Sequence, residues 1–439
     1  MRKSHQALNQ RAALGFYSGL MGLALLSACS PTDGLLMPTP ANFVGPQDRT
    51  PVNSVQPIYT SNDLNLLYVT DRAPIADPQT NARSYGSERS RTMSFGSIDI
   101  RIEPDSNGAV GEMKLGEIKE IGRFPEVPYP AVVSSAGYRR APGVVAAHEE
   151  AVASLQSEIR RRLAKTERKE VVVFIHGYNN TFNDAANATG GICRLLGGDF
   201  VCMVLTWPAG GSRGAFLGYN VDRESGEFAV ADMRKAIRAI GQTEGVRGVH
   251  IIAHSRGTDV LASAFEQLSA EAYVSRFSRT ENLKVRNIVL FAPDIDIDVA
   301  ATKIFDVFSD PDLPYGPKKN PNAAIPGSFH LTIYSSPGDQ ALGLSSSIFG
   351  SRLRLGQLDL SSPEARALRA DPGHRADLIE VDENTGAFGH GYFLSNPAVR
   401  SDLIALINGL KPGDPGRPLV EIRGPVRSWR IAGAQVEPR

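Results

Sequence analysis

The sequence contains few cysteines, few aromatic residues and no excess of charge of either sign. Three Cys in 439 residues exclude a small disulfide-stapled fold and leave no Cys cluster of the kind that binds zinc. The 47 Lys and Arg balance the 47 Asp and Glu, and no long basic run occurs. The charge pattern of a nucleic-acid-binding protein is therefore missing. Neither H-E-x-x-H nor G-x-G-x-x-G is present, so we expect no metal and no cofactor.

The residues that are abundant indicate a globular protein. The chain is 42% hydrophobic and 21% charged and contains 42 Gly, a composition that excludes disordered, collagenous and coiled-coil classes. The length predicts two or three domains, or one large α/β domain with additions.

The N-terminus has the order of a secretory signal. Arg2, Lys3 and Arg11 are accompanied by no acidic residue, and residues 12–28 are uncharged and rich in Leu. The segment ends in Leu-Ser-Ala-Cys29, which resembles the lipobox of bacterial lipoproteins and implies cleavage before Cys29 and acylation of this residue. An uncleaved membrane anchor with an incidental Cys is the alternative. Ser30 resembles the outer-membrane sorting pattern, so we expect a lipid-anchored protein at the outer membrane, facing the periplasm.

Five regions follow from this organisation. Residues 1–28 are the expected signal peptide, and residues 29–60, with six prolines, the expected tether. Residues 61–143 contain strand patterns at 64–70, 97–103 and 111–124 and form a β-rich extension, either a small subdomain or extra strands of the main sheet. Residues 144–411 form the expected catalytic domain, and residues 412–439 a C-terminal extension.

The central region alternates between strand and helix patterns. It begins with an amphipathic helix at 144–169, for which we prefer an ordinary surface helix over a basic membrane-facing one. Apolar strand patterns then alternate with helical ones. This order predicts a mostly parallel sheet covered by helices on both faces. The strands are expected at 171–175, 200–205, 249–253, 285–291, 331–334 and 378–381, and the helices at 182–196, 227–242 and 258–268.

The candidate nucleophile is Ser255 in His250-Ile-Ile-Ala-His-Ser-Arg-Gly257. An apolar strand leads through x-x-Ser-x-Gly into a helix, which resembles the nucleophile elbow of α/β-hydrolases with Ala253 at the first Gly position. Small residues two positions before and after the serine permit the tight turn. The helix N-terminus favours negative charge developing beside the hydroxyl.

Oxyanion donors are expected from two loops. One is the amide of Arg256, which follows the nucleophile, and the other belongs to the loop His176-Gly-Tyr178-Asn179. Tyr178 is the preferred donor on that loop and Asn179 the alternative. His176 precedes the nucleophile in the chain, so we interpret it as a structural histidine that holds the loop.

The general base and the acid are chosen by their positions relative to strands. His330 and His374 precede strands, at the wrong end, whereas His390 follows the strand at 378–381 and lies between glycines. His390 is therefore the candidate base. Asp339 follows the strand at 331–334 and is the preferred acid, with Asp294 as the alternative.

Three further features leave alternatives open. Trp207 could shape a substrate pocket or fill the core. Asp296 and Asp298 fail the EF-hand template, and we interpret them as solvated carboxylates or helix caps. Cys193 and Cys202 could pair in an oxidising periplasm, if the geometry permits.

Together these motifs resemble the α/β-hydrolase fold, in particular an uncharacterised bacterial branch of the esterase/lipase superfamily. The shared segments are FIHGYN, LTWP, AHS-x-G, Y-x-S-x-x-D-x-A-L and GH-x-YF, together with an upstream LLYVTDRAP, over about residues 60 to 410. The resemblance implies a serine hydrolase without a cofactor that cleaves an ester-type bond through Ser255, His390 and Asp339.

The expected partners are a small-molecule or lipid ester and a membrane reached through Cys29. Nucleic acid is not expected, and the sequence leaves protein partners and the substrate unspecified. The alternative function is that of a non-catalytic envelope lipoprotein that uses the fold as a binding module.

Overall fold

The computed structural model describes most of the chain beyond the predicted tether. The described residues are 63–76, 83–104, 111–211, 215–274, 283–306, 329–350, 353–368, 376–381, 389–417, 419–424 and 426–431. The predicted signal peptide, Cys29 and the tether lie outside these ranges. No helix among the described residues combines the length and the apolarity that a membrane span requires.

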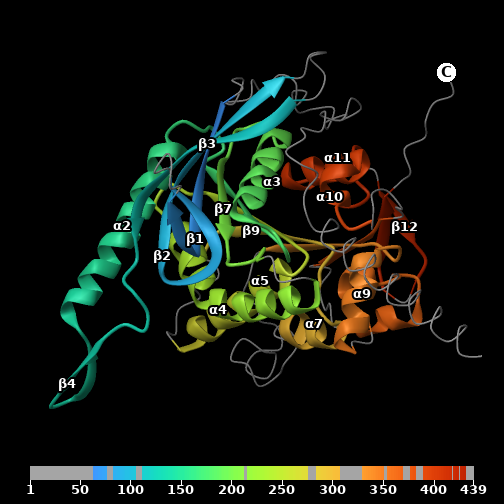
Figure 1. Ribbon diagram of the computed structural model, residues 1–439. Helices are drawn as coiled ribbons and strands as arrows, with labels where there is room; N and C mark the ends of the chain where they lie inside the picture. The colour runs from blue at the N-terminus through green and yellow to red at the C-terminus, as the bar shows by residue number, and fades with distance from the viewer. Residues whose placement is uncertain are drawn as a thin grey trace, which may run out of the picture.

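One large sheet organises the molecule (Figure 1). Its spatial order is β12-β13-β11-β10-β9-β8-β6-β7-β1-β2-β3, in which the strands from β13 to β1 are parallel and both edges are antiparallel. The central strands are buried along their whole length, as their apolar runs predict. The strands are β1 (Asp63–Ala76), β2 (Arg83–Pro104), β3 (Gly111–Arg123), β6 (Glu170–Ile175), β7 (Val201–Thr206), β8 (Gly248–His254), β9 (Val285–Phe291), β10 (His330–Ser335), β11 (Ala376–Glu380), β12 (Leu419–Ile422) and β13 (Ser428–Ile431).

Helices cover both faces of the sheet and enclose two hydrophobic cores (Figure 1). One face carries α3 (Phe182–Leu195), α10 (Tyr392–Ser395) and α11 (Pro397–Ile407). The other carries α2 (Pro142–Leu163), α4 (Ala215–Gly241), α5 (Gly257–Val274) and the short α7 (Ile297–Ala300). Helix α9 (Gln340–Phe349) follows β10, and short helical turns lie at η2 (Ala301–Asp306), η3 (Leu355–Gln357) and η4 (Pro363–Leu368). The predicted α/β fold class is confirmed.

Strands from both extensions belong to the main sheet. In the N-terminal extension, β1 pairs in parallel with β7, and β2 and β3 continue the sheet outward. This is the second of the two arrangements that the sequence left open. In the C-terminal extension, β13 pairs in parallel with β11. Both extensions therefore share a sheet with the predicted catalytic domain.

A second, two-stranded sheet precedes α2. Strands β4 (Ala131–Ser134) and β5 (Gly137–Arg140) form a hairpin that projects from the body at the amino end of α2 (Figure 1). The helix itself buries Ala151, Leu155, Ile159 and Leu163. Beside this buried face, Glu158 pairs with the half-buried Arg162 and with the exposed Arg161. These contacts fit the ordinary surface helix that the sequence favoured.

The predicted strands and helices are present, with two boundaries far off. Strand β2 begins at Arg83, whereas the sequence placed its start at Ser97, because residues 83–92 are mostly polar and lack an apolar alternation. Helix α4 begins at Ala215, whereas the sequence placed its start at Glu227, because the preceding turns contain Gly218 and a polar run that hides the helical period. Cys193 and Cys202 form a disulfide that joins the end of α3 to β7, with Cα atoms 6.1 Å apart.

Candidate active site

Ser255 lies in the turn between β8 and α5. Its φ of 51° is in the left-handed region, which is unusual for a residue other than Gly and marks a strained strand-to-helix turn. Neighbouring groups hold this conformation. The amide of Ser255 donates to the carbonyl of Phe291 at 3.0 Å, and its own carbonyl accepts from the hydroxyl of Thr258 at 2.7 Å and the amide of Asp294 at 3.2 Å.

Two glycines allow the loops to close around this turn. A Cβ on Gly257 would lie 2.2 Å from the carbonyl oxygen of His176, so only Gly fits under the end of β6. A Cβ on Gly177 would lie 2.6 Å from the Cβ of Ser255. The loop after β6 therefore packs directly against the serine. Backbone amides of this loop are close enough to be considered as donors to a group bound at Ser255.

His390 and Asp339 form a buried pair. The Nδ1–H of His390 donates to Oδ2 of Asp339 at 2.6 Å, and both side chains are almost completely buried. Asp339 is also the N-cap of α9, where its Oδ1 accepts from the amide of Leu342 at 3.0 Å. The carboxylate is thus fixed by a helix terminus, and it fixes the tautomer and orientation of the imidazole.

His254 connects the serine turn to the His390 loop. Its Nε2–H donates to the backbone carbonyl of His390 at 3.2 Å, and its ring contacts the rings of His390 and Phe393. Burial lowers the pKa of His254 well below its usual value, so the ring is neutral. In the sequence, His254 stood out only as a member of the nucleophile motif and had no assigned role. Its role emerges from a contact between positions 136 residues apart.

Asp294 belongs to a different network. Its carboxylate accepts from the hydroxyls of Tyr219 and Ser345 and pairs with Arg354 at 3.3 Å. Burial, followed by the charge of Asp294, raises the pKa of Tyr219, so the phenol stays protonated and donates. Among the described contacts of Asp294, none is with His390. Of the two acids that the sequence considered, the structure brings Asp339 to the histidine.

The loop 176–180 is held from beneath. The Nδ1–H of His176 donates to the carbonyl of Gly177 at 2.9 Å, and its Nε2 accepts from the amide of Trp207 at 3.0 Å. Trp207 is fully buried and stacks on His176, with ring centroids 5.1 Å apart. Burial lowers the pKa of His176 far below its ordinary range. His176 is therefore a neutral structural residue, and Trp207 fills the core.

The two candidate oxyanion amides on this loop differ in their surroundings. The amide of Asn179 donates to Oδ2 of Asp222 at 2.9 Å, and the amide of Gly210 donates to the same oxygen at 3.3 Å. Burial raises the pKa of Asp222 to about 6, although these two amides counteract it. The side chain of Tyr178 is buried against Tyr219. The Asn179 amide is thus engaged by the carboxylate of Asp222.

Arg72 is a supporting residue that sequence analysis did not single out. It is fully buried on β1, and its guanidinium donates to the carbonyls of Asn180 and Ala209, both at 2.8 Å, and to Thr206 at 2.8 Å. Five backbone or side-chain acceptors surround one cation, so Arg72 ties the N-terminal extension to the loops at the carboxyl ends of β6 and β7. The LLYVTDRAP segment was the available signal, but no local pattern indicated a role for its arginine.

The other candidates are placed as follows. Arg256 directly precedes α5, and its buried side chain pairs with Asp259 at 2.7 Å. Asp296 caps α7 by accepting from the amides of Asp298 and Val299, one of the two interpretations offered from the sequence. No group of three or more metal-ligating side chains occurs in the described part of the chain.

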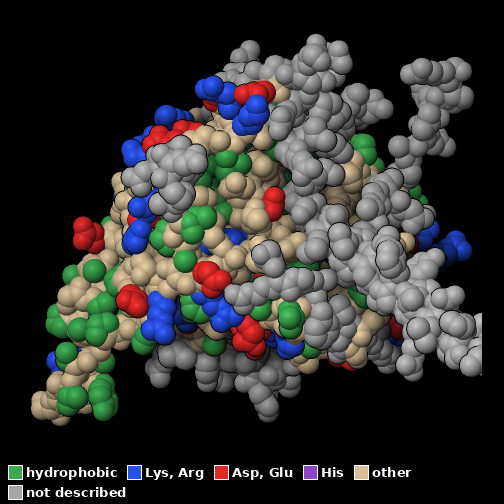
Figure 2. Space-filling model, in the orientation of Figure 1, with side chains coloured by type: hydrophobic (Ala, Val, Ile, Leu, Met, Phe, Trp, Pro, Cys, Tyr) green, Lys and Arg blue, Asp and Glu red, His purple; other side chains and the backbone are tan. Residues whose placement is uncertain are grey.

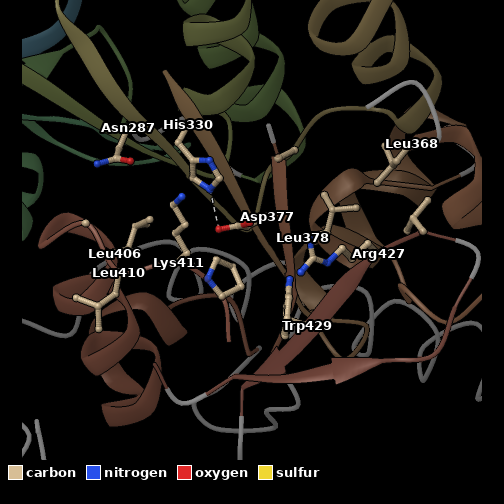
Figure 3. Close-up of a pocket in the computed structure, with 14 residues that line it drawn as sticks. Asn287, His330, Leu368, Asp377, Leu378, Leu406, Leu410, Lys411, Arg427 and Trp429 are labelled. Carbon is tan, nitrogen blue, oxygen red and sulfur yellow. Dashed lines mark hydrogen bonds and ion pairs between the residues drawn. The ribbon is translucent and has the colours of Figure 1, made fainter. Parts of the chain in front are cut away.

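A cavity of about 600 Å³ lies at the amino ends of the parallel strands, opposite the end of the sheet that carries Ser255 (Figure 3). His330, at the beginning of β10, points into it and its Nε2 is 2.7 Å from Asp377, so this histidine is far from the serine turn. The exclusion of His330 as the base on grounds of strand polarity agrees with this placement. The remaining lining is mixed: apolar side chains such as Leu378 and Trp429 alternate with the polar or charged side chains of Asn287, Lys411 and Arg427.

Comparison with known proteins identifies the family. A comparison with curated proteins finds no match. Among solved structures, a lipase-esterase related protein from Clostridium acetobutylicum is 11% identical and covers 56% of this chain and 96% of its own, with a TM-score of 0.27. A "putative dipeptidyl aminopeptidase IV" from Bacteroides ovatus is 11% identical at a TM-score of 0.26, and the match spans 80% of this chain and half of that protein.

These structural likenesses are too distant to support an argument. The family model described as alpha/beta hydrolase of unknown function (DUF900) matches residues 151–407, more than half of the sequence. That span contains the serine turn, the 176–180 loop and the His390–Asp339 pair. The chain belongs to this α/β-hydrolase family.

Proposed function

We propose that this protein is a serine hydrolase that cleaves an ester-type acyl bond, with Ser255 as nucleophile, His390 as general base and Asp339 as the orienting acid. The observation that carries the proposal is the buried His390–Asp339 hydrogen bond of 2.6 Å at the edge of the sheet where Ser255 occupies its strained turn. His254 links the two parts through the His390 carbonyl. These are the components of a Ser-His-Asp triad in the chain order of the fold.

The reaction follows from these roles. Ser255 Oγ attacks the acyl carbon while His390 Nε2 takes its proton, and the carbonyl oxygen becomes an oxyanion. Collapse of the intermediate expels the alcohol, which takes the proton from His390, and leaves an acyl-enzyme. Water then attacks the acyl carbon with the same base, releasing the carboxylic acid and restoring Ser255. Asp339 holds the ring through Nδ1 and stabilises the imidazolium.

We assign the oxyanion hole to the backbone amides of Arg256 and Tyr178. Arg256 is at the N-terminus of α5, where the helix dipole favours an anion. Tyr178 is preferred over Asn179 because Asp222 accepts the Asn179 amide. Rotating that amide toward a substrate would leave a buried carboxylate with fewer donors, which is costly.

We further propose that acylated Cys29 tethers the enzyme to the outer membrane, facing the periplasm. The lipobox-like sequence motivates this location. The buried disulfide between Cys193 and Cys202 supports it, because disulfides persist in oxidising compartments such as the periplasm and are rare in the cytosol. The tether would leave the enzyme access to small-molecule or lipid esters.

An active-site fluorophosphonate probe tests the proposed nucleophile. The probe should label the wild-type chain on the peptide containing Ser255, as located by mass spectrometry, and should not label Ser255→Ala. Ser263→Ala, a change at another buried serine on α5, serves as the matched control and should keep full labelling. Equal labelling of wild type and Ser255→Ala would contradict the proposal and favour a non-catalytic binding module. A series of esters of increasing acyl length would then define the substrate.

A further inference from the structure

The β4–β5 hairpin projects beyond the carboxyl ends of the parallel strands, the edge of the sheet that carries Ser255. Helix α2 leads into the beginning of β6, so its amino end faces the carboxyl ends of the strands. The ring of His148 on this helix contacts Phe124, which in turn contacts Phe95. Phe95 pairs with Val69 on β1, which pairs with Leu205 near the carboxyl end of β7. The helix therefore reaches the level of that edge at His148, and the hairpin lies beyond it.

The hairpin has no hydrophobic core of its own. Every residue of β4 and β5 is exposed except Ser134, which is partly buried. Val133 and Tyr138, a cross-strand pair separated from the turn only by Ser134 and Gly137, are 79% and 84% exposed. Figure 2 shows hydrophobic side chains gathered on this projecting tip, at the lower left. An isolated two-stranded hairpin is only marginally stable in water, so an apolar tip of this kind is suited to a partner.

The charges on the hairpin are all of one sign. Residues 127–148 contain no acidic residue, whereas Arg139 and Arg140 follow Tyr138 directly. In the register of the hairpin, Arg139 is opposite Val132 and Arg140 opposite Ala131. The arginines thus lie one and two positions behind the Val133–Tyr138 tip, on opposite faces, about 3–7 Å along the strands. One face therefore presents the Val133–Tyr138 pair with Arg140 behind it, and the other presents Val132 beside Arg139.

We infer that the β4–β5 hairpin is a membrane contact, whose Val133–Tyr138 tip enters the headgroup boundary of an anionic bilayer while Arg139 and Arg140 bind lipid phosphates. Tyrosine is favoured at that boundary because its ring is apolar and its hydroxyl is polar. Arginine near a surface of anionic lipids is attracted to it. With the hairpin in the bilayer, the edge of the sheet that carries Ser255 faces the membrane.

The charge pattern favours a bilayer over a second copy of the chain. In a two-fold symmetric contact the same patch meets itself, so two hairpins joined at their tips would bring Arg139 and Arg140 close to their own counterparts. Like charges placed opposite each other are destabilising. Phosphate groups, in contrast, complement both arginines without such repulsion.

The inferred contact depends on the proposed membrane tether in one respect: the tether brings the hairpin close to a bilayer. The tether enters the domain at the beginning of β1, which lies at the amino ends of the parallel strands, opposite Ser255. The 33 residues between Cys29 and Asp63 have a maximum length of about 110 Å. A domain of this size has a radius of gyration of about 21 Å. The chain can therefore span the domain while the hairpin touches the membrane.

Tryptophan fluorescence in reconstituted full-length protein tests this contact. Both native tryptophans, Trp207 and Trp429, are buried and give a constant background. Tyr138→Trp places a reporter at the tip, and Val420→Trp places one at an exposed position on edge strand β12 as the matched control. Each variant is incorporated into vesicles of phosphatidylethanolamine and phosphatidylglycerol containing brominated phospholipid. Co-flotation with the vesicles is measured in parallel.

We expect quenching of Tyr138→Trp to be about twofold stronger than that of Val420→Trp, since interfacial segments lie ~5–10 Å into the headgroup boundary. Adding Arg139→Ser and Arg140→Ser, or replacing phosphatidylglycerol by phosphatidylcholine, should reduce the difference. Equal quenching in chains that float with the vesicles would overturn the hairpin contact and leave the tether standing. Chains that do not float would overturn both. A blue shift of Tyr138→Trp emission that depends on protein concentration and not on lipid would assign the hairpin to a second copy instead.

Discussion

The carboxyl and amino ends of the parallel strands, here called the carboxyl edge and the amino edge of the sheet, each contain a histidine bonded to an aspartate. The two pairs differ in their burial and in the residues around them. At the carboxyl edge, His390 and Asp339 are 2.6 Å apart and buried. At the amino edge, His330 and Asp377 are 2.7 Å apart, and the histidine side chain is 33% exposed (Figure 3). Distance alone therefore does not distinguish a catalytic pair from a structural one.

The neighbours of each pair make the distinction. The carboxyl-edge pair is linked through His254 to a strained serine at a helix N-terminus. The amino-edge pair is linked through Arg417 to Asp402, in a buried network of charges. None of the described residues that line the cavity beside His330 is a serine, threonine or cysteine. We therefore expect the first pair to control the reaction rate and the second to control stability.

The largest contrast is expected from removing each histidine. His390→Gln should lower kcat/KM for a short-chain ester by about 10⁴-fold or more, because His390 is the proposed acceptor of the Ser255 proton. His330→Gln should change it by less than about threefold, as expected for a surface site away from the chemistry. Steady-state ester hydrolysis by the two purified variants checks this. Comparable losses in both would refute the division between the edges.

Replacing the aspartate of each pair should also give two different results. Asp339→Asn should lower kcat by about 10³- to 10⁴-fold by favouring the wrong tautomer of His390. Asp377→Asn should leave kcat unchanged and reduce the free energy of unfolding by about 1–3 kcal/mol, because Arg417 and His330 lose a charged partner. Urea unfolding together with kinetics separates these effects. An Asp339→Asn enzyme with near wild-type kcat would mean that Asp339 does not orient the base.

A smaller rate effect is expected at Gly177. An added Cβ would lie 2.6 Å from the Cβ of Ser255, so Gly177→Ala must displace the serine or the loop. A displacement of about 1 Å can lower kcat by about 10²-fold. Gly143→Ala is the control, since its Cβ would meet no atom within 4 Å. If both alanine variants kept full activity, the loop after β6 would not position the reacting groups.

The last expected effect concerns stability and its dependence on pH. Burial raises the pKa of Asp222 from 3.8 to about 6, so the folded protein binds this proton more tightly than the unfolded chain. The contribution of Asp222 to stability therefore falls as pH rises from about 4 to about 6 and stays low above that. Asp222→Asn should gain about 2–3 kcal/mol relative to wild type between pH 4 and pH 7. Denaturant unfolding at the two pH values measures the difference, and a constant difference would contradict this account.

Much of the fold could be predicted from the sequence because its strands are buried on both faces. Continuous apolar runs such as Val171-Val-Val-Phe-Ile175 mark strands of a parallel sheet, and strand polarity then sorts the histidines into two edges. This reasoning selected His390 and left His330 aside. Local patterns were weaker where polarity hides the period, as in the first turns of α4.

The supporting residues of the site could not be predicted in the same way. Arg72, His254 and Asp222 act through contacts with backbone groups 12 to 137 residues distant, and no local pattern encodes such partners. The choice between Asp339 and Asp294 is of the same kind. Both follow strands, and only the folded structure brings one of them, the N-cap of α9, beside His390, which precedes α10.

The most direct test of the account is a rapid-mixing measurement with p-nitrophenyl acetate. If Ser255 forms an acyl-enzyme, wild-type protein should release a burst of about one equivalent of p-nitrophenol before the steady state, provided that deacylation is the slower step. Mass spectrometry of the quenched sample should locate the acetyl group on Ser255, and Ser255→Ala should show neither the burst nor the adduct. A burst that persists in Ser255→Ala, or an acetyl group found on another residue, would contradict the central claim.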